Sequence, residues 1–342
     1  MFKRILSLLF CLCLIFAAGC QNTTVYDDLS DYESDVSIAD APVLAVNPLT
    51  GVADLSDASV ANRRPVAIMV NNVGVAQKVQ TGLSKADIIY ETEVEGGITR
   101  LMAVYQDITG LDKIGTVRSA RYPYVDLALG HNAIYIHCGQ DPTYCAPHLK
   151  DINHLSIDTK SKGAQRIANG LPSEHTLYAV AGDLWENISA TFDVNNTNPT
   201  PWASFSTDPV TLDGGAATTI NVDFPQKDTN FTYDATTGLY TRLSDGNQLT
   251  DYYTQETTTV KNVFVLMTSI TNYPDGKHRK VELSGGDGFY FTNGTAKAIK
   301  WSKGGANAPI KFTDTNGAEL QISAGNSWVC IPNSATSNTT FQ

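Results

Sequence analysis

The sequence has few cations for its length. It also has no hydrophobic run long enough to span a bilayer. It contains 24 Lys and Arg against 35 Asp and Glu, a formal net charge of -11. Proteins that bind nucleic acid, or that dock on anionic lipid by charge, need basic patches, so this balance argues against both. An anionic ligand would need a local cationic site, which makes the positions of the arginines informative.

Short catalytic signatures are also missing. Neither a G-x-S-x-G nucleophile elbow nor a Walker A loop occurs. The glycine-rich SGGDGF at residues 284–289 lies between expected strands, and no helix is expected after it. A β-bulge is therefore favoured over a phosphate-binding loop.

The N-terminus has the pattern of a bacterial export signal. A pair of cations precedes an apolar run from Ile5 to Ala18, and the run ends in AAGC at Cys20. Roughly 14 apolar residues are too few to span a bilayer stably, and AAGC resembles a lipobox. We therefore expect a lipoprotein signal peptide over residues 1–19 and a palmitate-type lipid anchor on Cys20, at the extracytoplasmic face of the cell membrane. The alternative is an ordinary secreted protein with an incidental cysteine.

Residues 20–60 differ in composition from the rest of the chain. They are rich in acids and hydroxyl residues and show little apolar periodicity. Such a segment cannot bury enough surface to offset its ordering entropy, so we expect a disordered acidic tether.

The remaining length predicts two domains, because it exceeds what one core usually organises. Residues 61–205 mix strand-like runs with a short helix between Pro123 and Gly130, which indicates an N-terminal mixed α/β domain. Residues 206–334 contain short runs rich in Thr, Tyr and Val between turns, which indicates a mostly antiparallel β domain. The fold class is thus α+β, with a frayed tail over residues 335–342.

The stretch YETEVEGGITRLMAVY, residues 90–105, reads as a β-hairpin. If its two glycines form a two-residue turn, Glu93 faces Arg100, and Glu91, Glu93 and Glu95 share one face of the hairpin. One arginine cannot neutralise three carboxylates. The unpaired acids either face solvent or line a cleft where repulsion raises one pKa toward general-acid use.

A second charged motif is VRSAR. Arg118 and Arg121 bracket Ser119 just before the helix that Pro123 opens. Two guanidinium groups beside a helix N-terminus favour a carboxylate or phosphate ligand. Alternatively, the arginines pair with Asp126 or with the hairpin glutamates as structural ion pairs.

Two cysteines lie close together in the sequence and could form a disulfide or a metal site. Cys138 and Cys145 flank a short loop, and outside the membrane a disulfide between them is expected as readily as two free thiols. Together with His137 and His148 they could instead form a zinc site, but the spacing matches no standard structural site. We predict no metal and no other cofactor.

Several longer motifs carry a resemblance to a known family. VEGGITR, IGTVRSARYPYVDLAL, AIYIHCG, GFYFTNGTAKAIKWSK and FTDTNGAELQISAGNSWVCIP resemble the YerB-like lipoproteins of Gram-positive bacteria, across residues 62–332. The His-x-Gly typical of that family is present at residues 137–139. The resemblance implies a lipid-anchored protein with an α/β and a β domain that supports peptidoglycan synthesis or envelope maintenance.

The favoured function is binding without catalysis. We expect a membrane-tethered protein that binds an anionic envelope ligand, peptidoglycan or a cell-wall synthesis protein, and no nucleic acid. The expected binding residues are Arg100, Arg118, Ser119, Arg121, Glu93, Glu95 and His137.

The competing function is a cell-wall glycan hydrolase or lyase. It would use Glu95 or Glu93 as general acid, with His137 or Asp141 assisting. Ser119, His137 and Asp141 could also be drawn as a nucleophile system, but sequence separation cannot place three side chains within hydrogen-bond reach.

Overall fold

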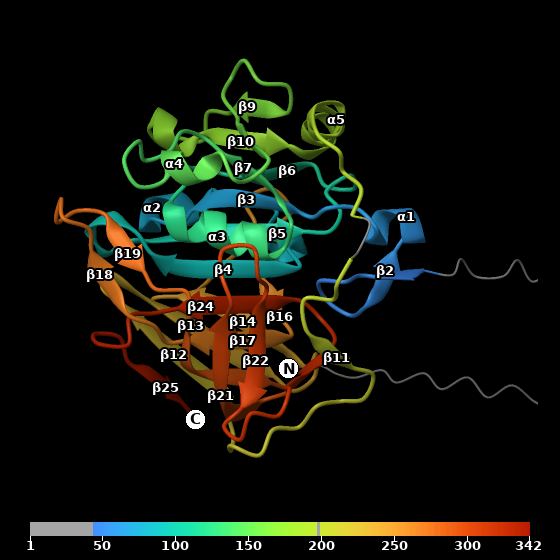
Figure 1. The fold of residues 1–342 in the computed structure, drawn as a ribbon, viewed down its shortest axis with the longest axis vertical. Coiled ribbons are helices and arrows are strands. Elements are labelled where there is room, and N and C mark those ends of the chain that lie inside the picture. Colours follow the sequence, from blue (N-terminus) through green and yellow to red (C-terminus); the bar gives the residue numbers. More distant parts are fainter. Residues whose placement is uncertain (1–43, 197–198) are drawn as a thin grey trace, which may run out of the picture. The chain divides into compact units, whose positions relative to one another are not determined.

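The described part of the chain is built around a ten-stranded mixed sheet (Figure 1). The computed structural model describes residues 44–196 and 199–342. The signal peptide and the anchor predicted at Cys20 lie outside these residues. The strands of the sheet are, in spatial order, β22 (Ile310–Asp314), β21 (Thr295–Lys303), β20 (Gly285–Thr292), β17 (Asn262–Leu266), β24 (Ser327–Ile331), β4 (Ile88–Glu93), β5 (Thr99–Tyr105), β3 (Val66–Asn71), β7 (Ile134–His137) and β8 (His154–Ser156).

Strand direction in this sheet brings several strand ends together. β3 and β4 both pair antiparallel with β5, while β7 and β8 continue parallel to β3. β24 pairs parallel with β4 on its other side. The carboxyl ends of β3, β4, β7 and β8 therefore meet at one edge of the sheet, where the loops that follow them come together.

Smaller sheets and short helices surround the large sheet. An antiparallel six-stranded sheet contains β15 (Asn247–Gln248), β14 (Leu239–Ser244), β13 (Lys227–Asp234), β12 (Thr219–Phe224) and β25 (Thr339–Phe341), with β16 (Thr259–Val260) beside β14. The other sheets are β6 (Lys113–Gly115) with β10 (Leu177–Val180) and β9 (Ala164–Arg166), β1 (Ala45–Val46) with β2 (Ala53–Leu55), β11 (Ser204–Ser206) with β23 (Gln321–Ser323), and β18 (Ile270–Asn272) with β19 (Arg279–Val281). The helices are α1 (Ala58–Ala61), α2 (Gly74–Gln77), α3 (Tyr122–Gly130), α4 (Ala146–Leu149) and α5 (Ala181–Thr191). No helix in residues 44–196 and 199–342 combines the length and the apolar character that a membrane crossing requires.

Both faces of the ten-stranded sheet are buried, which explains why its strands are apolar at nearly every position. Side chains such as Tyr90 and Met102 pack on one face against α3. Ile89 and Leu101, one residue earlier in each strand, pack on the other face, which β10, α5 and the six-stranded sheet cover. Figure 1 shows α3 lying in front of the strands β3, β5 and β4.

The α+β prediction is confirmed, with a mixed sheet in the N-terminal half and mostly antiparallel strands in the C-terminal half. The predicted boundary at residues 205 and 206 falls inside β11. Half of the large sheet comes from before that position and half from after it. All residues that the structure describes belong to one compact unit. The parallel pairing of β24 with β4 joins the halves.

Parts of two segments predicted to be disordered form regular structure among the described residues. The tether was expected to reach residue 60, but residues 44–60 form β1, β2 and most of α1 and bury Leu49, Leu55 and Val60. The tail expected to fray over residues 335–342 contains β25, which pairs with β12. Both predictions were wrong because isolated apolar residues in polar segments here find partners far away in the sequence.

Substitution of one glycine tests how α5 packs. Gly163 has φ +83, and an added Cβ would lie 2.4 Å from backbone atoms of Leu184 in α5. Gly170 has φ +81, but nothing lies within 4 Å of its added Cβ. Gly170→Ala therefore measures backbone strain alone, about 1–2 kcal/mol. Gly163→Ala should cost about 1–3 kcal/mol more in urea unfolding, because the helix must also shift. Equal costs for the two variants would show that α5 is not packed tightly here.

Candidate functional site

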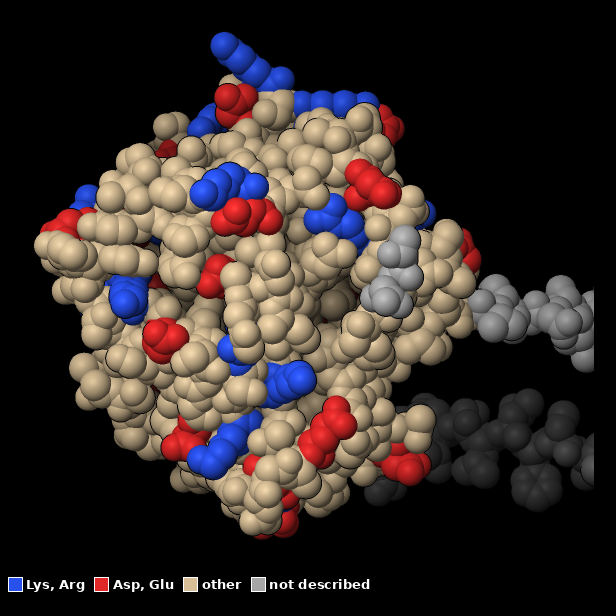
Figure 2. Space-filling model, viewed as in Figure 1, with Lys and Arg blue, Asp and Glu red and all other residues tan. Residues whose placement is uncertain are grey.

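The predicted site residues gather at the edge where β3, β4 and β7 end. The backbone N–H of Arg118 donates to Met69 of β3, and that of Cys138 donates to the carbonyl of Arg118. These bonds fix the VRSAR loop between β3 and the loop that follows β7. On the face shown in Figure 2, basic and acidic residues are interspersed and form no broad patch of one sign. A cationic site on this face would therefore be local.

Arg100, Arg118 and Arg121, here called the arginine cluster, come close together. Arg100 is only 4% exposed and donates from Nη1 to the carbonyl of Ser119 at 2.9 Å. Burial, together with the charges of Arg121 and Arg118, lowers its pKa to about 10, although Glu95 partly opposes this. Within the described residues, no carboxylate lies within ion-pair distance of Arg100.

The other two members of the cluster have different partners. Arg118 donates from Nη1 to the carbonyl of Glu174 at 2.8 Å, while its buried Nε has no hydrogen-bond partner. Arg121 pairs with Glu95. The three guanidinium groups thus share one carboxylate, so the cluster carries an excess of positive charge.

The β18–β19 hairpin, residues 270–281, is here called the arm and lines a small pocket beside Arg121. His278 of the arm lies 3.2 Å from Glu95 and 3.2 Å from Asp141. Arg279 of the arm lies 3.4 Å from Glu93. The pocket has a volume of about 10 Å³, which is room for about one water molecule.

Aromatic side chains line the same pocket. Tyr144 and Tyr273 stack with ring centroids 3.9 Å apart and an interplanar angle of 13°. Tyr273 belongs to the turn of the arm, and Tyr144 follows Asp141 in the loop after β7. The stack therefore joins the arm to the N-terminal half of the chain.

The two glutamates of the pocket differ in protonation behaviour. Burial opposes ionisation of Glu95, but the Arg121 guanidinium and hydrogen bonds outweigh it and lower the pKa. Burial raises the pKa of Glu93, and Arg279 only partly offsets this. Glu93 Oε1 is buried without a hydrogen-bond partner. Of the two, only Glu93 has the raised pKa that a general acid requires.

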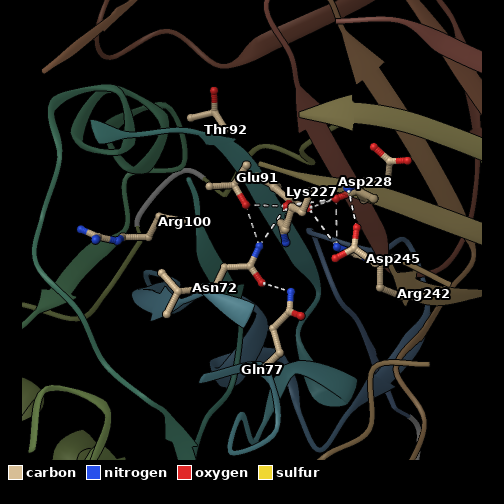
Figure 3. Close-up of polar contacts among 12 residues, drawn as sticks. Asn72, Gln77, Glu91, Thr92, Arg100, Lys227, Asp228, Arg242 and Asp245 are labelled. Atoms are coloured by element: carbon tan, nitrogen blue, oxygen red, sulfur yellow. Dashed lines mark hydrogen bonds and ion pairs between the residues drawn. The ribbon is translucent and has the colours of Figure 1, made fainter. Parts of the chain in front are cut away.

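The hairpin register differs from the prediction. The Val94 N–H donates to the Ile98 carbonyl, so the turn itself contains three residues, Glu95–Gly97. Arg100 therefore pairs with Thr92, and Glu93 pairs with Thr99. A shift of one residue moves a side chain to the other face. Arg100 therefore points away from Glu91, as Figure 3 shows, and the predicted facing of Glu93 and Arg100 was wrong.

The solvent-facing alternative for the acids also fails. Glu91 and Glu93 are 0% and 1% exposed. Glu91 is enclosed by side chains of the C-terminal half, with Lys227 Nζ at 3.0 Å and Arg242 Nη2 at 3.5 Å (Figure 3). Its pKa falls to about 2, because these two cations outweigh the effect of burial.

His137 does not assemble a nucleophile system with Ser119 and Asp141. Its Nδ1 lies 2.8 Å from the carbonyl of Gly139 and its Nε2 lies 3.0 Å from His154 Nδ1. Burial lowers the pKa of His137 to about 4, so the ring is neutral. The Asp141 carboxylate accepts backbone N–H groups of its own loop.

The cysteine pair is not joined in the structure. Cys138 and Cys145 are free thiols. Cys145 belongs to the core on the α3 face of the large sheet, whereas Cys138 packs against the core on the other face. The two cysteines therefore do not come together as zinc ligands, and His148 packs at a tilt against the Tyr122 ring. Among the described residues, no group of three or more His, Cys, Asp or Glu is placed to hold a metal ion.

Sequence reasoning missed the arm. His278 and Arg279 lie in KHRK, residues 277–280, directly after the turn YPDG. A run of basic residues in an acidic chain was the available signal. Nothing local in the sequence indicates that this turn folds back onto residues 93–95, more than 170 positions earlier.

Comparison with known proteins identifies the family. The N-terminal domain model described as "Protein of unknown function (DUF3048)" matches residues 49–195, and the C-terminal domain model of the same family matches residues 220–329. The chain belongs to this two-part family, which confirms the resemblance to YerB-like proteins.

Two comparisons concern YerB of Bacillus subtilis. The chain is 30% identical over 307 residues to "Putative lipoprotein YerB" of strain 168, covering 83% of this chain and 85% of the relative. The crystal structure of the YerB protein from Bacillus subtilis matches with a TM-score of 0.73 and 27% identity. That match covers 86% of this chain and 98% of the crystallised one.

Proposed function

We propose that this protein is a lipid-anchored binding protein at the extracytoplasmic face of the cell membrane, and that the arginine cluster binds an anionic group of a cell-envelope ligand. Its role is support of peptidoglycan or envelope maintenance. The anchor is supported by the AAGC motif at Cys20 and by the name of the relative.

The observation that carries the binding proposal is the poorly compensated charge of Arg100, because the nearby Glu95 is ion-paired with Arg121 instead. A buried cation without an ion-paired carboxylate of its own is costly, and two neighbouring arginines raise that cost. A bound carboxylate or phosphate would offset it through charge-assisted hydrogen bonds to several guanidinium groups. The partnerless Arg118 Nε provides one more donor for the same anion.

Titration calorimetry with soluble peptidoglycan fragments tests this function. Fragments with free carboxylates should bind the purified protein, and Arg121→Gln should weaken binding about ten-fold or more. The control Lys311→Gln removes one exposed positive charge from β22, at the far edge of the sheet, and should leave affinity unchanged. Equal binding of fragments whose carboxylates have been amidated would show that the cluster does not recognise an anion.

Glycan hydrolysis is the second candidate function. The environment of Glu93 favours it. Its carboxyl is buried, has a raised pKa and keeps one oxygen free of partners. Against it, Arg279 lies beside the same carboxyl, and Glu95 is ion-paired with Arg121. Release of soluble fragments from peptidoglycan by the wild type but not by Glu93→Gln would favour the hydrolase and contradict a purely binding role.

A further inference from the structure

A polar groove lies between α2 and the strands β14 and β15, on the boundary between the two halves of the chain. Its volume is about 580 Å³, within the range of about 300–1,000 Å³ that small-molecule sites usually have. Gln77 and Lys78 line it from the N-terminal half, and Gln248 and Tyr252 from the C-terminal half. We call it the junction groove. It shares no residue with the arginine cluster or the pocket beneath the arm.

The groove continues into a smaller hollow with a rigid polar floor. The two hollows share Gly74 and Asp245, and the smaller one has a volume of about 110 Å³. Asn72 and Lys227 line it, and both are bonded to the buried Glu91, at 2.9 and 3.0 Å. Figure 3 shows these side chains converging on Glu91 from both halves. Their positions are therefore fixed before any ligand arrives.

The charges that line the two hollows are balanced. Lys78 and Lys227 are matched by Asp245 and Asp251. Asp251 is already used, because it accepts the backbone N–H of Gly82 at 2.6 Å and that of Tyr253 at 2.9 Å. An anion or a cation would gain little here, which favours an uncharged ligand, in contrast to the arginine cluster.

Amide side chains supply the hydrogen-bonding surface. Gln77, Asn247, Gln248 and Gln255 all line the groove. The nitrogens of Gln77, Asn247 and Gln255 already donate within the protein. The amide oxygens of these three residues can still accept hydrogen bonds from the hydroxyl and amide groups of a ligand. Gln248 is exposed and makes no side-chain hydrogen bond within the described residues, so its amide is available.

Exposed apolar surface concentrates at the same place. Among the described residues, six large hydrophobic side chains are exposed, and three of them, Val75, Tyr252 and Tyr253, lie in or beside the groove. The other three belong to residues 44–52. Tyr252 lines the groove and is 38% exposed, so its ring can pack against the apolar face of a ligand while its hydroxyl remains in water.

We propose that the junction groove binds an uncharged oligosaccharide, whose sugar rings pack on Tyr252 and whose hydroxyl and acetamido groups bond to the groove amides. A sugar chain combines apolar ring faces with many neutral donors and acceptors, which is what this lining offers. A polypeptide would need pockets for varied side chains and partners for its backbone, and the balanced amide lining favours it less.

Titration of the full-length protein with chitotetraose, an uncharged chain of N-acetylglucosamine units, tests this proposal, with cellotetraose as a probe that lacks acetamido groups. Tyr252→Ala should weaken binding about ten-fold, the loss expected for one aromatic contact. Gln248→Ala should weaken it about three-fold, as expected for one hydrogen bond. Affinity should depend little on salt, because no net charge is involved.

Matched controls separate this site from the rest of the molecule. Gln165 is an exposed strand glutamine on β9 that makes no side-chain hydrogen bond in the described residues, so Gln165→Ala should bind like the wild type. Arg121→Gln should also bind the sugar normally, which distinguishes this proposal from the anion site. Thermal unfolding confirms that each variant is folded. Absence of binding to both sugars, or unchanged binding by Tyr252→Ala, would overturn the proposal.

Discussion

Glu91→Gln is expected to lower the free energy of unfolding by about 3–5 kcal/mol, the usual cost of breaking a buried ion pair by removing one partner. Glu91 is fully buried between the large sheet and the six-stranded sheet. Its substitution would leave Lys227 and Arg242 without their shared counter-charge. Arg242 is itself 0% exposed, and two of its nitrogen atoms already lack hydrogen-bond partners.

Hydrogen bonds from both halves of the chain increase this cost. Asn72 and Thr99 donate to Glu91 Oε1 at 2.9 and 2.8 Å, and Trp328 Nε1 donates to Oε2 at 3.1 Å. Glutamine presents an amide nitrogen at one of these oxygen positions and cannot accept there. At least one buried donor would then lose its partner.

Urea unfolding at neutral pH measures the effect. The control is Glu186→Gln, which breaks the pair with Lys162 at a side chain that is 65% exposed. Exposed pairs contribute little, so its unfolding free energy should change by less than about 1 kcal/mol. Similar small losses for both variants would contradict a structural role for the Glu91 network.

Acid should remove the same stabilisation. The pKa of Glu91 is lowered in the folded protein from 4.5 to about 2, so the stability it contributes is fully present above 4.5. That stability is lost as pH falls from 4.5 toward 2. The difference between wild type and Glu91→Gln should therefore shrink across this interval and stay constant from pH 5 to 7.

Local sequence patterns predicted the strands of the large sheet well but not the surroundings of its charges. The alternation around Glu91 and the apolar run of β3 depend on neighbours in sequence, and both strands form. The burial and ion pairing of Glu91 depend on Thr229 and Arg242, which are 138 and 151 residues away in the sequence. No local pattern contains that pairing.

The candidate site was predictable to the same extent. Arg118 and Arg121 are close in sequence, so their proximity follows from local structure. Arg100 lies near them because the Arg118 N–H is bonded to β3, which pairs with the strand that carries Arg100. Which residue of β4 lies opposite Arg100 depends on whether the turn contains two or three residues. The glycine pair is compatible with both turn lengths. The contacts of His278 depend on the arm folding back, which is a tertiary event.

Arg100→Met is expected to stabilise the ligand-free protein by about 1–2 kcal/mol, the size of gain found when a strained functional residue is replaced. Arg100 is buried, unpaired and repelled by two neighbouring arginines. Methionine has an unbranched apolar side chain that fills the buried volume without a charge. The gain exceeds the loss of the one hydrogen bond to Ser119.

Arg242→Met is the matched control, because Arg242 is a buried arginine that has a counter-charge. It pairs with Glu91, donates to Thr229 at 2.9 Å, and stacks over the ring of Trp328 at 4.8 Å. Its replacement should destabilise the protein by about 2 kcal/mol or more, which urea unfolding of both variants measures. If Arg100→Met also destabilises the protein, the arginine cluster serves the fold rather than a ligand.

The same pair of variants separates stability from binding. An anion that binds the folded state raises its stability in proportion to ln(1 + [L]/Kd), so added phosphate should raise the melting temperature of the wild type. Arg100→Met should melt at a higher temperature than wild type without phosphate and should respond to phosphate much less. Arg242→Met should melt lower and keep its response, because it leaves Arg100, Arg118 and Arg121 in place. A phosphate response that survives in Arg100→Met would place the anion elsewhere.

If Arg100→Met stabilises the protein and Arg242→Met destabilises it, the protein keeps Arg100 at a cost to its own stability. That behaviour is expected of a residue retained for a ligand.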